Sequence, residues 1–203
     1  MLRAHRVVFD GGAAWSGGYG IGDVDAQLRG NGTGMAPPPV TWFSASSEVE
    51  STASVIARIG FTFSPSLMVE GGAVFGMPRV AVSITGDAEA ASQQLEGEQL
   101  QEYLFDGALV WQLPMQMGSR MRPFVLGGAG YLRQLHQERT MVETGQVYYT
   151  GVGARYWLRG GSGTTRSLGV RGDLRANWRT GGIDFENKTR LYPSLAVHLF
   201  FSL

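Results

Sequence analysis

Residues Leu191–Leu203, L-Y-P-S-L-A-V-H-L-F-F-S-L, alternate between two kinds of side chain without a break. The odd positions, from Leu191 to Leu203, are all apolar, whereas the even positions include Tyr192, Ser194 and His198. A strict period of two residues is typical of a β-strand whose two faces meet different environments. A wholly apolar face belongs either in a soluble core or against lipid, and the rest of the chain decides between them.

Seven earlier segments repeat this alternation, so the sequence predicts eight strands in a single domain, residues 1–203. The seven segments cover roughly residues 7–19, 54–63, 67–77, 102–112, 124–133, 149–158 and 168–178. In the segment 124–133, glycines blur the pattern; we assign Leu126 and Leu132 to the outward face and Tyr131 and Arg133 to the inward face.

The connections between these segments differ in length. Ile21–Glu48 and the polar stretch Gly86–Gln99 are long, whereas Ser64–Ser66 has the composition of a tight turn. Outer-membrane barrels have short periplasmic turns and longer outer loops, so this pattern fits such a barrel with both chain ends in the periplasm. The long first loop, with Trp42 and Phe43 following Pro37–Pro39, is the surface that we expect to contact a partner, although it can equally fold back over the barrel mouth.

The position of the charges favours lipid over a soluble core. Ionisable side chains gather on the face opposite the apolar one, and they comprise Arg6, Asp10, Arg58, Glu70, Asp106, Arg155, Arg171, Asp173, Arg175 and His198. A lipocalin-like barrel or a soluble sandwich would place charges outside and apolar residues inside. Lipid cannot satisfy an open sheet edge, so the sheet must close. We therefore predict an all-β fold: an eight-stranded antiparallel up-and-down transmembrane β-barrel.

Aromatic residues near the outward strand ends agree with this prediction. Trp15, Tyr19, Tyr103, Trp111 and Trp178 lie where interfacial aromatic side chains belong in a membrane barrel.

The ten inward ionisable residues are expected to form a charge network in the lumen. Eight strands enclose a space only just wide enough for side chains, so arginines and carboxylates from opposite walls would pair across it. We favour a plugged lumen, with a narrow gated pore as the alternative. Arg171–Arg175, R-G-D-L-R, is the best local sign of the network, but it does not show whether the network opens.

Composition excludes several other classes of protein. The net charge is 0 and no basic stripe is present, which argues against nucleic acid as a partner. The chain has no cysteine, no run of 18 apolar residues and no carboxylates at metal-loop spacing, so we expect no disulfide, transmembrane helix, metal or other cofactor. No signal-peptide pattern precedes the first strand, so for an exported protein we expect a mature form.

The search for an enzyme yields weak candidates. His136 is expected in the outer loops near Glu138 and Ser92, which weakly resembles the Ser-His-acid triad of hydrolases. His198 is expected to face inward, near Asp10 or Asp173. Neither arrangement matches a local motif of outer-membrane lipid A deacylases or palmitoyltransferases. We therefore expect no catalytic residue, and rank a lipid-modifying enzyme third among the functions.

The stretch Arg122–Tyr131, R-P-F-V-L-G-G-A-G-Y, resembles the R-P-Y-V-G-x-G-x-G-Y strand of OmpA-like outer-membrane β-barrel proteins. Residues 151–156 and 168–175 are similar to the next two strands of that family. The closing strand is similar to its C-terminal assembly signal, carried here by Leu199, Phe201 and Leu203, with Leu203 in place of the usual terminal aromatic residue. The resemblance implies location in the bacterial outer membrane, contact with its lipid, and recognition by the barrel-assembly machinery during insertion.

A structural or surface-interaction role through the outer loops is the function that these observations favour. The resemblance brings no shared catalytic residues, and the chain has no room for a periplasmic peptidoglycan-binding domain. A narrow channel or transporter for small or apolar solutes is the alternative. We expect a monomer, whose surface partner the sequence does not identify.

Overall fold

The computed structural model describes residues 6–28, 40–86, 92–115, 120–136, 141–160 and 166–203. These residues form twelve strands: β1 (Arg6–Ser16), β2 (Tyr19–Leu28), β3 (Val40–Val49), β4 (Thr52–Thr62), β5 (Leu67–Gly76), β6 (Arg79–Thr85), β7 (Gln93–Gln99), β8 (Gln101–Gln112), β9 (Met121–Leu135), β10 (Val142–Arg159), β11 (Ser167–Gly181) and β12 (Arg190–Ser202). No helix in the described part of the chain is long and apolar enough to cross a membrane.

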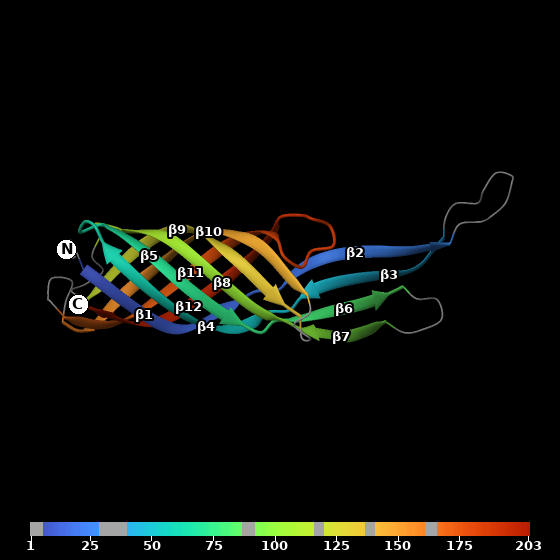
Figure 1. Ribbon diagram of the computed structural model, residues 1–203, viewed down its shortest axis with the longest axis horizontal. Coiled ribbons are helices and arrows are strands. Elements are labelled where there is room, and N and C mark those ends of the chain that lie inside the picture. Colours follow the sequence, from blue (N-terminus) through green and yellow to red (C-terminus); the bar gives the residue numbers. More distant parts are fainter. Residues whose placement is uncertain (1–5, 29–39, 87–91, 116–119, 137–140, 161–165) are drawn as a thin grey trace.

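Eight of the strands close into a barrel, in the order β1-β12-β11-β10-β9-β8-β5-β4. Every neighbouring pair is antiparallel, and β1 closes the barrel by pairing with both β4 and β12. The start of β1 and the end of β12 lie at the same end of the barrel, together with the Ser64–Ser66 turn (Figure 1). We call this end the base and the opposite end the mouth. The predicted all-β class and the eight-stranded antiparallel barrel are confirmed.

The remaining four strands form a separate sheet, in the order β2-β3-β6-β7, which projects beyond the mouth (Figure 1). We call this sheet the extension. Its strands fall in the stretches Ile21–Glu48 and Gly86–Gln99, which the sequence predicted as loops, and in the residues before Gly86. The prediction was wrong because the stretches that hold β2, β3 and β7 are rich in small and polar residues, which gave them the composition of loops. β6 does alternate, with Val80, Val82 and Ile84 on one face. Pro37–Pro39 and Asp87 lie outside the described residues.

The barrel wall carries apolar side chains on its outer surface. Leu174, Val152 and Leu195 are each about half exposed, and the outward positions of the eight strands between the aromatic bands carry no ionised side chain in the described residues. The inward positions carry the charges. This distribution is the reverse of a soluble barrel and is that of a transmembrane β-barrel.

Exposed aromatic side chains form one band near the base, with Phe9 and Trp111, and another near the mouth, with Trp15 and Trp178. Six residues separate Phe9 from Trp15 along β1, which corresponds to roughly 15–20 Å along the axis of a tilted strand. Tyr19 does not join the outer band as expected. Its ring lies inside the mouth, with its centroid 5.1 Å from that of Tyr192.

The inward and outward faces of β9 are the opposite of those predicted. Leu126 and Leu132 are buried inside the barrel, whereas Tyr131 and Arg133 are exposed. The prediction failed because Gly127, Gly128 and Gly130 lie on both faces of the strand and have no side chain. The alternation of apolar and polar residues was therefore too weak to show which face points outward. Gly128 faces inward, and a side chain there would occupy the space of the Tyr149 phenol, whose Cζ lies 2.6 Å from an ideal Cβ.

Candidate functional site: the barrel interior

The ten ionisable residues that the sequence assigned to the lumen are all buried in the structure. They come from seven of the eight barrel strands, all except β9. Successive side chains of a strand point to opposite faces, so every second residue of each strand points to the interior. The ten residues are Arg6, Asp10, Arg58, Glu70, Asp106, Arg155, Arg171, Asp173, Arg175 and His198. Nine of them, all except Arg6, form a layer that we call the central network.

Glu70 on β5 is the anion at the centre of this network. It accepts a hydrogen bond from Arg171 on β11, which stands on the opposite side of the barrel in the strand order. It also accepts one from Arg155 Nη2 at 2.9 Å, and Arg58 Nη1 lies 4.0 Å from its second oxygen. Because β5 and β11 are opposite walls, the pair formed by Glu70 and Arg171 crosses the middle of the lumen.

Two further carboxylates extend the network on either side. Asp106 Oδ2 accepts hydrogen bonds from Arg58 Nη2 at 2.6 Å and from the Tyr149 hydroxyl at 2.8 Å. Asp173 accepts from Arg171 Nε at 3.1 Å and from Arg175 Nε at 2.5 Å. The layer therefore matches four buried arginines with the four carboxylates of Asp10, Glu70, Asp106 and Asp173.

His198 and Asp10 complete the layer with looser contacts. His198 Nε2 lies 3.3 Å from Asp173 Oδ2, so of the two carboxylates expected near this histidine the structure places Asp173 beside it. Asp10 Oδ2 lies 3.8 Å from Arg171 Nη1, and neither oxygen of Asp10 has a hydrogen-bond partner in the structure. Several buried nitrogens of Arg58, Arg155 and Arg171 also have no hydrogen-bond partner in the structure. These donors and the Asp10 oxygens can therefore form hydrogen bonds with water.

An apolar layer lies between the central network and the base. Val8, Met68, Phe124, Trp157 and Phe200 are buried there in one cluster. The ring centroids of Trp157 and Phe200 are 5.9 Å apart. The Arg171 guanidinium lies 4.7 Å from the centroid of Phe124, so the two layers are stacked directly on each other.

A third layer lies at the mouth, and sequence reasoning missed it. Arg179 Nη2 donates to Gln134 Oε1 at 2.6 Å, and Gln134 Nε2 donates to Glu102 Oε2 at 2.7 Å. The Arg179 guanidinium also lies 4.9 Å from the centroid of Tyr19. Arg179 continues the inward alternation of Arg171, Asp173 and Arg175, so extending that pattern by two positions beyond Asn177 would have found it.

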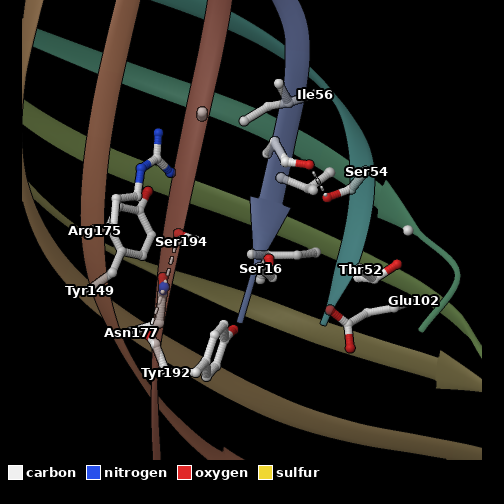
Figure 2. Close-up of a pocket in the computed structure, with 15 residues that line it drawn as sticks. Ser16, Thr52, Ser54, Ile56, Glu102, Tyr149, Arg175, Asn177, Tyr192 and Ser194 are labelled. Atoms are coloured by element: carbon white, nitrogen blue, oxygen red, sulfur yellow. Dashed lines mark hydrogen bonds between the residues drawn. The ribbon is translucent and has the colours of Figure 1, made fainter. Parts of the chain in front are cut away.

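A small space remains between the central network and the mouth layer. It has a volume of about 40 Å³ for water, and Figure 2 shows Arg175, Asn177 and Ser194 on one side of it with Ser54 and Glu102 on the other. A water molecule needs roughly 10–15 Å³ on this measure, so the space holds about three waters. This cavity is therefore lined by both polar and apolar side chains and has room for a few water molecules.

The histidines do not assemble a catalytic triad in the described residues. His136 Nδ1 lies 2.7 Å from Glu98 Oε2 on β7, which is a different partner from the expected Ser92 and Glu138. Glu138 itself lies outside the described residues. No group of three or more metal-ligating side chains occurs among the residues that the structure describes.

Comparison with known proteins supports the fold. The structure is similar to the crystal structure of the outer membrane protein OprG from Pseudomonas aeruginosa, with a TM-score of 0.50 over 99% of this chain and 96% of that chain. The two sequences are 12% identical, so the likeness concerns the fold alone. No protein-family model and no curated protein matches the sequence. The chain therefore has the fold of an outer-membrane β-barrel.

Proposed function

We propose that this protein is an integral barrel of the bacterial outer membrane, with a plugged lumen and a structural or surface-interaction role. The observation that carries the proposal is the central network, in which Arg171 and Glu70 meet across the lumen from opposite walls. The apolar layer toward the base adds a second barrier to ions. The uncharged outer wall between two aromatic bands supports placement in a lipid bilayer.

Orientation follows from the two ends of the barrel. The base carries the Ser64–Ser66 turn, the start of β1 and the end of β12, which fits the periplasmic side. The extension then stands on the outer side, where exposed Trp42 and Val24 are available to a partner. We propose that this sheet is the surface through which the protein acts, as a monomer.

Assembly is part of the proposal. Leu199, Phe201 and Leu203 are exposed on the outer face of the closing strand, with Phe201 opposite Phe9 of β1. This arrangement supports recognition of β12 by the barrel-assembly machinery before β1 pairs with it. Membership of the OmpA-like family, which the sequence resembles, remains a prediction.

The first test is refolding into lipid vesicles, followed by electrophoresis of boiled and unboiled samples. We expect a heat-dependent mobility shift and β-rich circular dichroism only when lipid or detergent is present. Single-channel recording then distinguishes a plugged barrel from a conducting channel, because a plugged barrel produces no current steps in the bilayer. A chain that folds in plain buffer would refute the membrane placement.

A narrow channel for small solutes is the second candidate, and the water-sized cavity favours it. Arg175 lines this cavity, and its Nη2 has no hydrogen-bond partner in the structure, so a rearranged network has a donor ready to solvate a passing solute. For this function we expect discrete conductance steps that Arg171→Ala or Asp173→Ala alters. A bilayer that stays silent with the parent chain and both variants would exclude it.

A lipid-modifying enzyme is the third and least supported function. Its candidates are His136 and His198, and neither lies in a triad in the described residues. We would reject this function if His136→Ala and His198→Ala left outer-membrane lipid turnover unchanged.

A further inference from the structure

The connection between β11 and β12 folds back against the mouth of the barrel. We call its residues 182–189 the strap, and Figure 1 shows it beside the start of β2. Ile183 in the strap is 8% exposed and packs with Ile21, Val49 and Leu100. These three residues lie where the extension meets the barrel, so the apolar anchor of the strap sits at the junction of the two sheets.

The strap is fastened to the polar layer at the mouth. The Ile183 amide donates to Gln134 Oε1 at 3.0 Å, and the Gly182 amide donates to the carbonyl oxygen of Thr144 at 2.8 Å. Gln134 is fully buried, and its Nε2 donates to Glu102 Oε2 at 2.7 Å. Glu102 lines the cavity of about 40 Å³ shown in Figure 2, so Gln134 joins the strap directly to the wall of that cavity.

Two glycines form a hinge at the start of the strap. Gly181 and Gly182 both have a φ of 73°, in the left-handed region that favours glycine. A side chain at Gly182 would also collide with Arg179 Nη2. The sharp turn from β11 into the strap therefore requires glycine, and glycine has the widest range of backbone angles for a change of direction at this point.

The far part of the strap is a compact turn that is bonded to itself. Asp184 Oδ1 accepts a hydrogen bond from the Glu186 amide at 2.9 Å, and Asp184 Oδ2 accepts one from the Lys188 amide at 3.1 Å. The Arg190 side chain closes the turn with hydrogen bonds to Asp184 and Glu186. All these bonds lie within residues 184–190, so they persist when the strap moves away from the mouth. A compact tip on a glycine hinge is the arrangement of a lid.

We propose that the strap is a lid on the lumen, closed in this structure, which opens to connect the cavity with the outer side. The proposal rests on the orientation argued above, in which the mouth is the outer end. Opening breaks the hydrogen bonds of the Gly182 and Ile183 amides and exposes Ile183 to water, whereas the barrel strands stay paired. Burial of Ile183 favours the closed state. Segments that can open locally in this way do so at a lower free energy than global unfolding requires.

Thiol labelling measures the opening, because the chain contains no cysteine. Ser54→Cys places a thiol in the wall of the cavity, and Ser167→Cys places one near the base; both serines are buried. The probe is a small water-soluble methanethiosulfonate, added to the refolded barrel in detergent. We expect Ile183→Ser to speed labelling at position 54 about tenfold, which corresponds to about 1.4 kcal/mol of lost closure, and to leave position 167 unchanged. Val24→Ser, at an exposed valine of the extension, is the matched control and should change neither rate.

Equal acceleration at both positions would overturn the lid, because it would show a general loosening of the barrel. Rates that Ile183→Ser leaves unchanged would overturn it as well. If Ile183→Ser does not refold, hydrogen exchange of the parent chain decides: the Ile183 and Phe185 amides should exchange well before the Leu174 amide of β11, and a single rate for all three would contradict the lid. The heat-shift test alone decides the membrane placement, so failure of the lid and failure of the placement are separate results.

Discussion

The barrel and the extension are built on the same period of two residues, but their side chains meet different surroundings. In the barrel, Leu174 faces outward and Glu70 is buried in an ionic layer. In the extension, Val24 and Asp25 are adjacent on β2 and both are exposed. Alternation alone therefore specifies a strand, and the separation of apolar from charged residues between its faces specifies a membrane barrel.

Removing the central anion of the barrel should have the largest effect. Glu70→Gln leaves Arg58, Arg155 and Arg171 without their shared carboxylate, and breaking a buried ion pair from one side costs about 3–5 kcal/mol. The measurement is the free energy of unfolding in urea, with the protein in lipid vesicles. In the extension, Asp25→Asn is the matched control.

That control removes a carboxylate with one exposed hydrogen bond, from Ser44 Oγ at 2.6 Å. Its effect should stay within about 0.5 kcal/mol, as for most surface substitutions. Equal losses for Glu70→Gln and Asp25→Asn would show that the central network is solvated like a surface, and would favour the channel over the plug.

A charge on the outer wall should have the next largest effect. Leu174→Arg places a cation against lipid and should lower the free energy of unfolding in vesicles by about 2–4 kcal/mol, as arginine does near the middle of a bilayer. Val24→Arg in the extension should change it by less than about 0.5 kcal/mol. A Leu174→Arg variant as stable as the parent would contradict the membrane placement of the wall.

In β1, β4, β11 and β12 the sequence predicted which single residues point inward, because apolar residues alternate strictly with the others in these strands. Their outward positions are continuously apolar, so the phase of Asp10, Arg58 and Arg171 followed directly. The rule failed for β9, where Gly127, Gly128 and Gly130 carry no side chain to mark a face.

The extension and the partners within the central network could not be predicted in this way. Strands with polar side chains on both faces, such as β7, have the composition of loops. Partner choice depends on which strands stand opposite each other: β5 and β11 are about 100 residues apart in the chain. Only closure of the barrel brings Glu70 to Arg171.

Filling the space at Gly128 should have an intermediate effect. Gly128→Ala sets a methyl group against the Tyr149 phenol and the backbone of Gly107, and overpacking of this kind costs about 1–3 kcal/mol. Gly20→Ala on β2 is the control, since its Cβ would have no neighbour closer than 4.0 Å. Unfolding in urea measures both, and equal stabilities would mean that Tyr149 can move and that the lumen is less tightly packed than the structure indicates.

The smallest effect should come from the place where the two regions meet. The connection between β11 and β12 lies against β2, and the Phe185 amide donates to Ile21 O at 2.9 Å. Asp184 holds this connection through hydrogen bonds from Arg190, one of them 2.9 Å from Nη2. These bonds from Arg190 keep the pKa of Asp184 below its ordinary value of 3.8.

A lowered carboxylate pKa stabilises the folded connection above that ordinary value, and the contribution is lost as the pH falls below about 3.8. Asp184→Asn should therefore weaken hydrogen-exchange protection of the Phe185 amide at pH 6, by less than about 1 kcal/mol for a partly exposed ion pair. At strongly acid pH, where Asp184 of the parent is also protonated, the two proteins should converge. Asp23→Asn, an exposed extension residue, should leave the protection unchanged at both pH values. A difference that persists in acid would show that packing of the connection against β2, and not the Asp184 charge, joins the extension to the barrel.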